Sequence, residues 1–158
     1  MIMKGNEKVI AALNEFLADE LTAINQYMVH SEMCANWGYE RLHEVAEKRA
    51  IGEMKHAEKL IGRILFLEGQ PVVSQLKKIH IGATVEAQLK HDLDAEADAI
   101  KAYNDGIRLC LEAGDNGSRE LIEDNLEDEE EHLDWLEAQL DQINQMGLQN
   151  YLLGQVKE

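Results

Sequence analysis

The sequence has few of the residues that interrupt helices or build sheets. Among its 158 residues the only proline is Pro71, and aromatic residues make up 5 % of the chain. Proline breaks helices because it lacks a backbone N–H, whereas strands are enriched in aromatic and β-branched residues. Their scarcity, beside plentiful Ala, Leu, Glu, Lys and Gln, predicts an all-α protein.

The sequence also predicts no segment for membrane insertion or export. No apolar stretch approaches the roughly 20 residues that a membrane-spanning helix needs, and residues 1–5 have no apolar secretory core. The two cysteines, Cys34 and Cys110, form no metal-type cluster and are interpreted as buried thiols in a reducing compartment. We therefore expect a cytoplasmic protein without a membrane partner.

Positive charge is scarce. The chain carries 15 Lys and Arg against 31 Asp and Glu, a formal net charge of −16. Such a chain repels nucleic acids and anionic lipids, which are polyanions, and attracts cations. Most of the carboxylates are expected to form a solvated surface, so the functional question is whether a few lie on buried helix faces.

The hydrophobic pattern divides the chain into helices. Four long helices are expected at about residues 6–36, 39–68, 83–113 and 118–146, and a short fifth at 148–156. Asn6 is the expected N-cap of the first, and Gly38 and Gly69 end the first two. The short links predict two antiparallel hairpins, and the longer link at 70–81 can run the length of a bundle. We predict one domain over residues 1–158, a four-helix bundle with one long crossover and a short C-terminal helix.

The two halves of the chain repeat each other with an offset of 76 residues. The differences 96 − 20, 129 − 53 and 132 − 56 all equal 76, and they relate Glu20, Glu53 and His56 to Glu96, Glu129 and His132. The same offset pairs apolar positions: Leu13 with Leu89, Leu17 with Leu93, Ile24 with Ile100, Tyr27 with Tyr103, Cys34 with Cys110 and Leu60 with Leu136. The two hairpins are therefore expected to be related by a pseudo-twofold axis.

Two glutamates fall on the apolar stripes of the first and third helices. Glu20 lies at helical spacing among Leu13, Leu17 and Ile24, and Glu96 repeats this pattern. A buried carboxylate is costly unless something satisfies it. A single such glutamate could lie on a helix face that is in fact exposed. Two glutamates in matching positions make that explanation weaker. Tyr27 on the same stripe is either a hydrogen-bond partner of the cluster or a core aromatic.

The second and fourth helices each carry a Glu-x-x-His motif, Glu53–His56 and Glu129–His132. Residues at i and i+3 lie on one helix face, so each pair can bind one metal. A single such motif is more often a surface pair, but here each follows a stripe glutamate by the same 33 residues, since 53 − 20 and 129 − 96 are equal. Two glutamates plus two Glu-x-x-His motifs form the ligand pattern of di-metal bundles.

These six residues predict a site for two first-row metal ions such as iron, manganese or zinc, because carboxylate and imidazole ligands suit them. Four carboxylates would neutralise two divalent ions. The pseudo-symmetry predicts that Glu53 and Glu129 bridge the metals and that Glu20 and Glu96 are terminal ligands. His56 and His132 would then bind one metal each, and O2 or H2O2 would take an electron from each of two irons.

The chain resembles the bacterioferritins from end to end. The resemblance is carried by the di-metal ligands and by residues 19–27, 52–57, 63–69, 134–137 and 147–152. It implies a ferritin-like fold and a hollow shell of 24 subunits that stores ferric mineral. It also implies a ferroxidase centre in each subunit, which oxidises Fe(II) with O2 or H2O2.

The same resemblance implies a b-type haem between twofold-related subunits, with one methionine ligand from each. The matching residue is Met54, which points about 100° away from Glu53 on a helix and can face a partner. An iron–sulfur ferredoxin is implied as the reductant for iron release. Some bacterioferritins have a histidine and an aspartate of an accessory iron site where this chain has Lys48 and Gly52, so that site is not expected here.

Three functional hypotheses follow. The leading one is a ferroxidase and iron-storage subunit. The second is a di-metal oxidase or peroxidase that uses the same ligands without storing iron. The third is a structural or haem-carrying subunit of a mixed shell with a second subunit type, whose carboxylates only bind stray cations.

Overall fold

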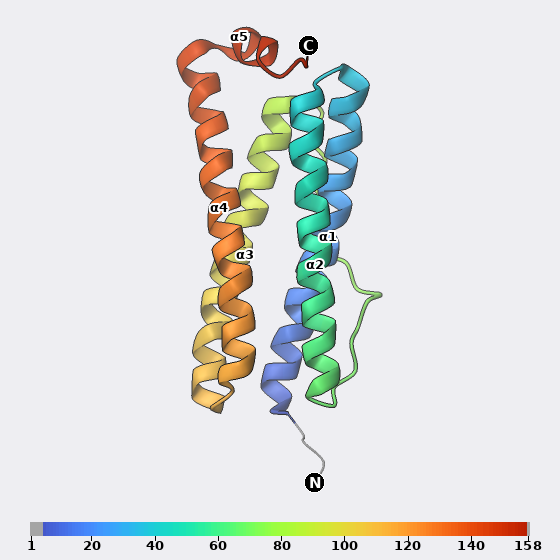
Figure 1. Ribbon diagram of the computed structural model, residues 1–158, viewed down its shortest axis with the longest axis vertical. Helices are drawn as coiled ribbons and strands as arrows, with labels where there is room; N and C mark the ends of the chain where they lie inside the picture. The colour runs from blue at the N-terminus through green and yellow to red at the C-terminus, as the bar shows by residue number, and fades with distance from the viewer. Residues whose placement is uncertain (1–4, 158) are drawn as a thin grey trace.

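The computed structural model describes residues 5–157, which fold into five helices (Figure 1). The helices are α1 (Glu7–Trp37), α2 (Glu40–Phe66), α3 (Val85–Ala113), α4 (Asn116–Met146) and α5 (Leu148–Leu153). Within these residues there is no strand, and none of the helices is long and apolar enough to cross a membrane. The predicted all-α four-helix bundle with a short fifth helix is confirmed. The expected lack of an export signal concerns residues 1–5, of which 1–4 lie outside the described part.

The long connection between α2 and α3 determines the topology of the bundle. α1 and α2 form one antiparallel hairpin, α3 and α4 the other, and residues 67–84 return along the side of the bundle (Figure 1). Side chains of α1 hold this crossover by accepting backbone N–H bonds. Thr22 accepts from Lys77 at 2.8 Å, and His30 Nε2 accepts from Gly82 at 3.0 Å. The crossover is therefore fixed against α1, which also carries part of the candidate site.

The helix ends follow local rules, but several differ from expectation by two or three residues, including the start of α3 at Val85 instead of 83 and the end of α5 at Leu153 instead of 156. Asn6 caps α1 as predicted, because its side chain accepts from Lys8 N and Val9 N. α2 ends at Phe66, and the left-handed residue after it is Glu68 (φ 64°), not Gly69. A Cβ at residue 69 would lie 2.6 Å from Ile10 Cγ2, so close packing requires this glycine. α4 begins two residues earlier than expected, after Asp115.

Two apolar clusters make up the core. One contains Leu13, Leu17, Leu60 and Ile122, and the other contains Leu42, Leu89, Leu136, Ile143 and Tyr151. α5 folds over the end of the bundle (Figure 1), where the buried Tyr151 hydroxyl donates to Gln139 at 2.7 Å. Cys34 and Cys110 are buried free thiols, as expected. The candidate ligands interrupt this apolar interior in the middle of the bundle.

Candidate metal centre

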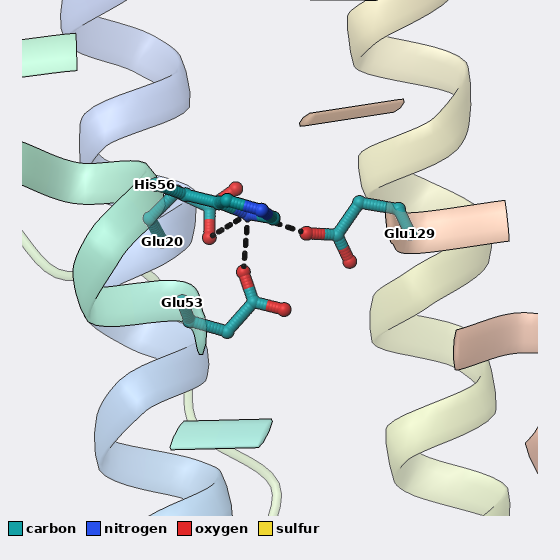
Figure 2. Close-up of side chains that lie close together, drawn as sticks. All are labelled: Glu20, Glu53, His56 and Glu129. Atoms are coloured by element: carbon teal, nitrogen blue, oxygen red, sulfur yellow. Dashed lines mark hydrogen bonds and ion pairs between the residues drawn. The ribbon is translucent and has the colours of Figure 1, made fainter. Parts of the chain in front are cut away.

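Six acidic and imidazole side chains meet inside the bundle, and each long helix contributes at least one. They are Glu20 of α1, Glu53 and His56 of α2, Glu96 of α3, and Glu129 and His132 of α4. The first set, Glu20, Glu53, His56 and Glu129, is drawn in Figure 2; the second is Glu53, Glu96, Glu129 and His132. Within each set the ligand atoms lie within 4.8 Å of one another. The structure thus brings together all six residues singled out in the sequence.

The two sets share Glu53 and Glu129, and each shared carboxylate divides its oxygens between them. His56 Nδ1 lies 3.2 Å from Glu53 Oε2 and 3.1 Å from Glu129 Oε1 (Figure 2). His132 Nδ1 lies 3.4 Å from Glu53 Oε1 and 3.7 Å from Glu129 Oε2. The terminal glutamates complete the sets, with Glu20 3.6 Å from His56 and Glu96 3.5 Å from His132. This is the arrangement that two bridging and two terminal carboxylates need.

Several atoms of the cluster are buried without a hydrogen-bond partner. They are Glu20 Oε2, Glu53 Oε1, Glu96 Oε2, Glu129 Oε1 and His132 Nδ1. Burying such atoms unpaired costs free energy, and buried charges are normally paired or bound to metals. Four carboxylates and two imidazole nitrogens that converge in this way fit a pair of divalent cations.

The buried groups perturb one another's protonation. Burial and the neighbouring Glu53 charge raise the pKa of Glu20 well above its usual value. Burial and the contact with Glu129 raise the pKa of Glu96 to about 8. Burial disfavours imidazolium, yet contacts with Glu129, Glu53 and Glu96 raise the pKa of His132 to about 11. Without metal the cluster therefore retains protons, which cations must displace.

Two tyrosines bind the terminal glutamates across the hairpins. The Tyr27 hydroxyl donates to Glu96, and the Tyr103 hydroxyl donates to Glu20. Both rings are buried, so Tyr27 is a core aromatic and a partner of the cluster at once. Tyr103 received no role in the sequence analysis, although the 76-residue repeat paired it with Tyr27. The repeat was the signal that could have identified it.

An aspartate that is not among the predicted metal ligands hydrogen-bonds one of the two histidines. Asp128 Oδ2 lies 2.7 Å from His56 Nε2, while the other ring nitrogen of His56 faces the glutamates. Metal-binding histidines usually donate their second N–H to such a carboxylate. The sequence offers no sign of this role, because Asp128 stands in an unbroken run of acidic residues from 127 to 131.

A cavity of about 670 Å³ connects the cluster with the surface between α1 and α3. It reaches all four glutamates. Its outer part is lined by residues of α1, α3 and the crossover: Asp19, Lys77, His80, His91, Asp94 and Asp98. Small ions and molecules can therefore enter without unfolding the bundle.

Met54 lies apart from this cluster, on the exposed side of α2. Its exposed fraction is 44 %, whereas its neighbour Glu53 is 1 % exposed. Ile51 on the same helix is also exposed. The structure therefore separates the predicted haem ligand from the predicted metal ligands, as the helix geometry required.

Comparison with known proteins gives similarity along nearly the whole chain. The family model of the ferritin-like domain matches residues 10–146. Bacterioferritin of Brucella melitensis is 42 % identical over 149 residues, covering 94 % of this chain and 92 % of that protein. Bacterioferritin of Rhodobacter capsulatus is 42 % identical over 151 residues (96 % and 94 %). Bacterial ferritin of Synechocystis sp. is 43 % identical over 155 residues (98 % and 99 %). The matched range includes every residue of the cluster.

Proposed function

Because this chain belongs to the ferritin-like family, and its curated relatives are bacterioferritins, we propose that it is an iron-storage subunit that oxidises Fe(II) at the six-residue centre. Iron storage is the function that these relatives support. The observation that carries the ferroxidase proposal is the sharing of Glu53 and Glu129, whose two oxygens face different histidines. Shared carboxylates would hold two Fe(II) ions close together, so that one oxidant molecule can take one electron from each ion.

The side chains of the centre would bind and position the iron for that reaction. The carboxylates of Glu20, Glu53, Glu96 and Glu129 would hold two Fe(II) ions, and His56 and His132 would bind one each. Bound iron supplies one electron per ion to O2 or H2O2. Tyr27 and Tyr103 orient the terminal glutamates, and the low polarity of the buried surroundings strengthens the carboxylate–cation attraction. The cavity between α1 and α3 admits the reactants.

The exposed apolar residues of the first hairpin support assembly. Met28, Val29, Ile51 and Met54 are each more than two-fifths exposed on α1 and α2. Such residues cluster where subunits meet. We propose a 24-subunit shell built from dimers in the cytoplasm, with Met54 of each subunit binding haem b between two copies. By family resemblance, an iron–sulfur ferredoxin would supply electrons for iron release.

An anaerobic Fe(II) titration of the metal-free protein, followed by addition of oxidant, tests the proposal. We expect a break at about two irons per chain and then fast oxidation seen by absorbance. Uptake far beyond two irons establishes storage, whereas saturation at two favours a non-storage oxidase or peroxidase. Slow oxidation without a break favours a structural or haem-carrying subunit in a mixed shell.

A substitution of Glu53, one of the two shared glutamates, tests the centre most directly. Glu53→Ala removes a ligand from both metal positions, so the fast phase should fall at least 100-fold while light scattering still finds assembled protein. Glu130→Ala, which removes an exposed carboxylate from α4, serves as the matched control. Fast oxidation in Glu53→Ala would contradict the assigned centre.

A further inference from the structure

Two histidines outside the six-residue centre lie side by side at the outer end of the cavity. His80 belongs to the crossover and His91 to α3, and both line the cavity that reaches the four glutamates. Their ring centres are 5.7 Å apart, and the ring planes differ by 28°. His80 is exposed and His91 is half-buried. The pair therefore lies where the cavity opens to solvent.

The spacing of the two rings fits a shared metal ion. A metal such as zinc lies about 2.0–2.1 Å from an imidazole nitrogen, which places the centres of two ligating rings about 5–6 Å apart. The observed 5.7 Å falls within this range. Neither ring makes a hydrogen bond or an ion pair with another residue of the range 5–157, so both rings can accept a ligand. Asp94, one helical turn after His91, lines the same cavity and offers a carboxylate.

One buried glutamine fixes the backbone near both histidines. Gln26 Oε1 accepts from the backbone N–H of His80 at 3.1 Å. Gln26 Nε2 donates to Asp92, the residue after His91, at 2.8 Å. Gln26 and Asp92 are both buried, so water does not compete for their hydrogen bond. The crossover and α3 are thus held in place before any cation binds, which lowers the entropic cost of binding.

The charges around the pair favour cations. The outer part of the cavity has three carboxylates, of Asp19, Asp94 and Asp98, against the two ammonium groups of Lys77 and Lys78. The Lys77 ammonium is paired with Asp19 at 2.5 Å. Asp94 and Asp98 form no ion pair with any residue that the structure describes. Unpaired negative charge at the mouth of a cavity raises the local concentration of cations.

We propose that His80 and His91 form an outer metal site, which binds one first-row divalent cation at the mouth of the cavity and delivers it to the buried centre. Imidazole ligands suit such ions, and in the proposed function the ion is Fe(II). Two imidazoles and the nearby Asp94 leave the other coordination positions to water, so the ion is held loosely enough to move on. The binding step stands by itself, whereas delivery rests on the proposed ferroxidase function.

Chemical modification tests the binding step at the two histidines themselves. Diethyl pyrocarbonate modifies neutral imidazoles, and peptide mass spectrometry measures this at His80 and His91 as Zn(II) is added to the assembled, metal-free protein. We expect Zn(II) to protect both histidines over the same concentration range. In His91→Ala, half-protection of His80 should need at least about 10-fold more Zn(II), because one ligand is lost. Unchanged protection of His80 in His91→Ala, or protection of neither histidine, would overturn the inference.

Two further variants show whether the outer site is independent. His43→Ala removes an imidazole that does not line this cavity, so it is the matched control and should leave the protection of His80 and His91 as it is. Glu53→Ala removes a ligand from both buried metal positions, yet His80 and His91 should be protected at the same Zn(II) concentration as before. Loss of their protection in Glu53→Ala would overturn the inference, because the buried centre would then account for the effect.

Oxidation rates test delivery. The double variant His80→Ala with His91→Ala keeps all six buried ligands, so its rate at saturating Fe(II) should stay the same, while the Fe(II) concentration for half-maximal rate should rise about 10-fold. His43→Ala is again the control. The same dependence on Fe(II) in the double variant and the unaltered protein would overturn delivery. Protection of both histidines in a protein without fast oxidation would support the outer site but contradict the proposed ferroxidase function.

Discussion

At the scale of single residues, the candidate centre depends on hydrogen bonds between side chains that are far apart in the sequence. Tyr103 and Glu20 are separated by 83 positions, yet the phenol is a donor to this buried carboxylate. Tyr27 does the same for Glu96. A buried carboxylate that loses its donor keeps the full cost of desolvation. The tyrosines therefore stabilise the centre as well as orienting it.

Tyr103→Phe tests this stabilisation, because it removes the hydroxyl and little else. We expect the free energy of unfolding of the metal-free protein to fall by about 1–3 kcal/mol. Tyr39→Phe is the control, since no described residue hydrogen-bonds the Tyr39 hydroxyl. Equal melting temperatures for the two variants would show that the Tyr103 hydroxyl contributes nothing.

At the scale of helices, the start of α4 is tied to the end of α2. Asp115 accepts from Ser118 N at 3.0 Å, which caps α4, and from Arg63 at 2.8 Å. Arg63 also donates to Ser118 Oγ at 2.9 Å. One aspartate thus stabilises a helix terminus and joins the two hairpins at the end of the bundle distant from α5.

Asp115→Ala should lower the free energy of unfolding by about 1–2 kcal/mol at neutral pH, because the cap is lost. Burial raises the pKa of Asp115, but bonds from Ser118 and Arg63 outweigh it and hold the pKa below its usual value. The stabilisation by ionised Asp115 is therefore present above about pH 4, and it is lost as the pH falls through the pKa of Asp115 in the folded protein. Melting curves at pH 7 and pH 3 measure both effects, and Asp124→Ala on the exposed side of α4 is the control.

At the scale of the whole molecule, the buried cluster couples stability to protons and metal. The pKa of Glu96 is raised to about 8 and that of His132 to about 11, so the folded metal-free protein holds more protons than the unfolded chain. A state that binds more protons loses stability as the pH rises. Bound metal ions replace these protons and so remove the dependence of stability on pH.

We therefore expect the melting temperature of metal-free protein to fall between about pH 5 and pH 8. Zn(II) at about 100 times its dissociation constant should add about 2.7 kcal/mol, and the curve should become flatter with pH. Scanning calorimetry with and without Zn(II) measures this, and excess chelator should restore the metal-free curve. A metal-free melting temperature that rises over this range would contradict the protonation scheme.

Much of the fold and of the centre was predictable because it depends on local spacing. Helical period fixes which residues share a face, so Glu53 with His56, and Glu129 with His132, could be paired without a structure. The 76-residue repeat then indicated that both pairs belong to one centre. Helix ends were predicted to within a few residues; α2 ends just before Glu68, whose φ is positive, and α4 begins directly after its N-cap Asp115.

The sequence by itself thus determined the helices, their pseudo-twofold repeat and the identity of the six candidate ligands. Only the tertiary structure decided which oxygen faces which histidine, that Tyr103 donates to Glu20, and that Asp128 is the residue of its acidic run that lies against Nε2 of His56. The reason is physical. Periodicity places a residue on a face of its own helix. A contact between helices depends on how the two hairpins pack, and the spacing of residues along the sequence contains no information about that packing.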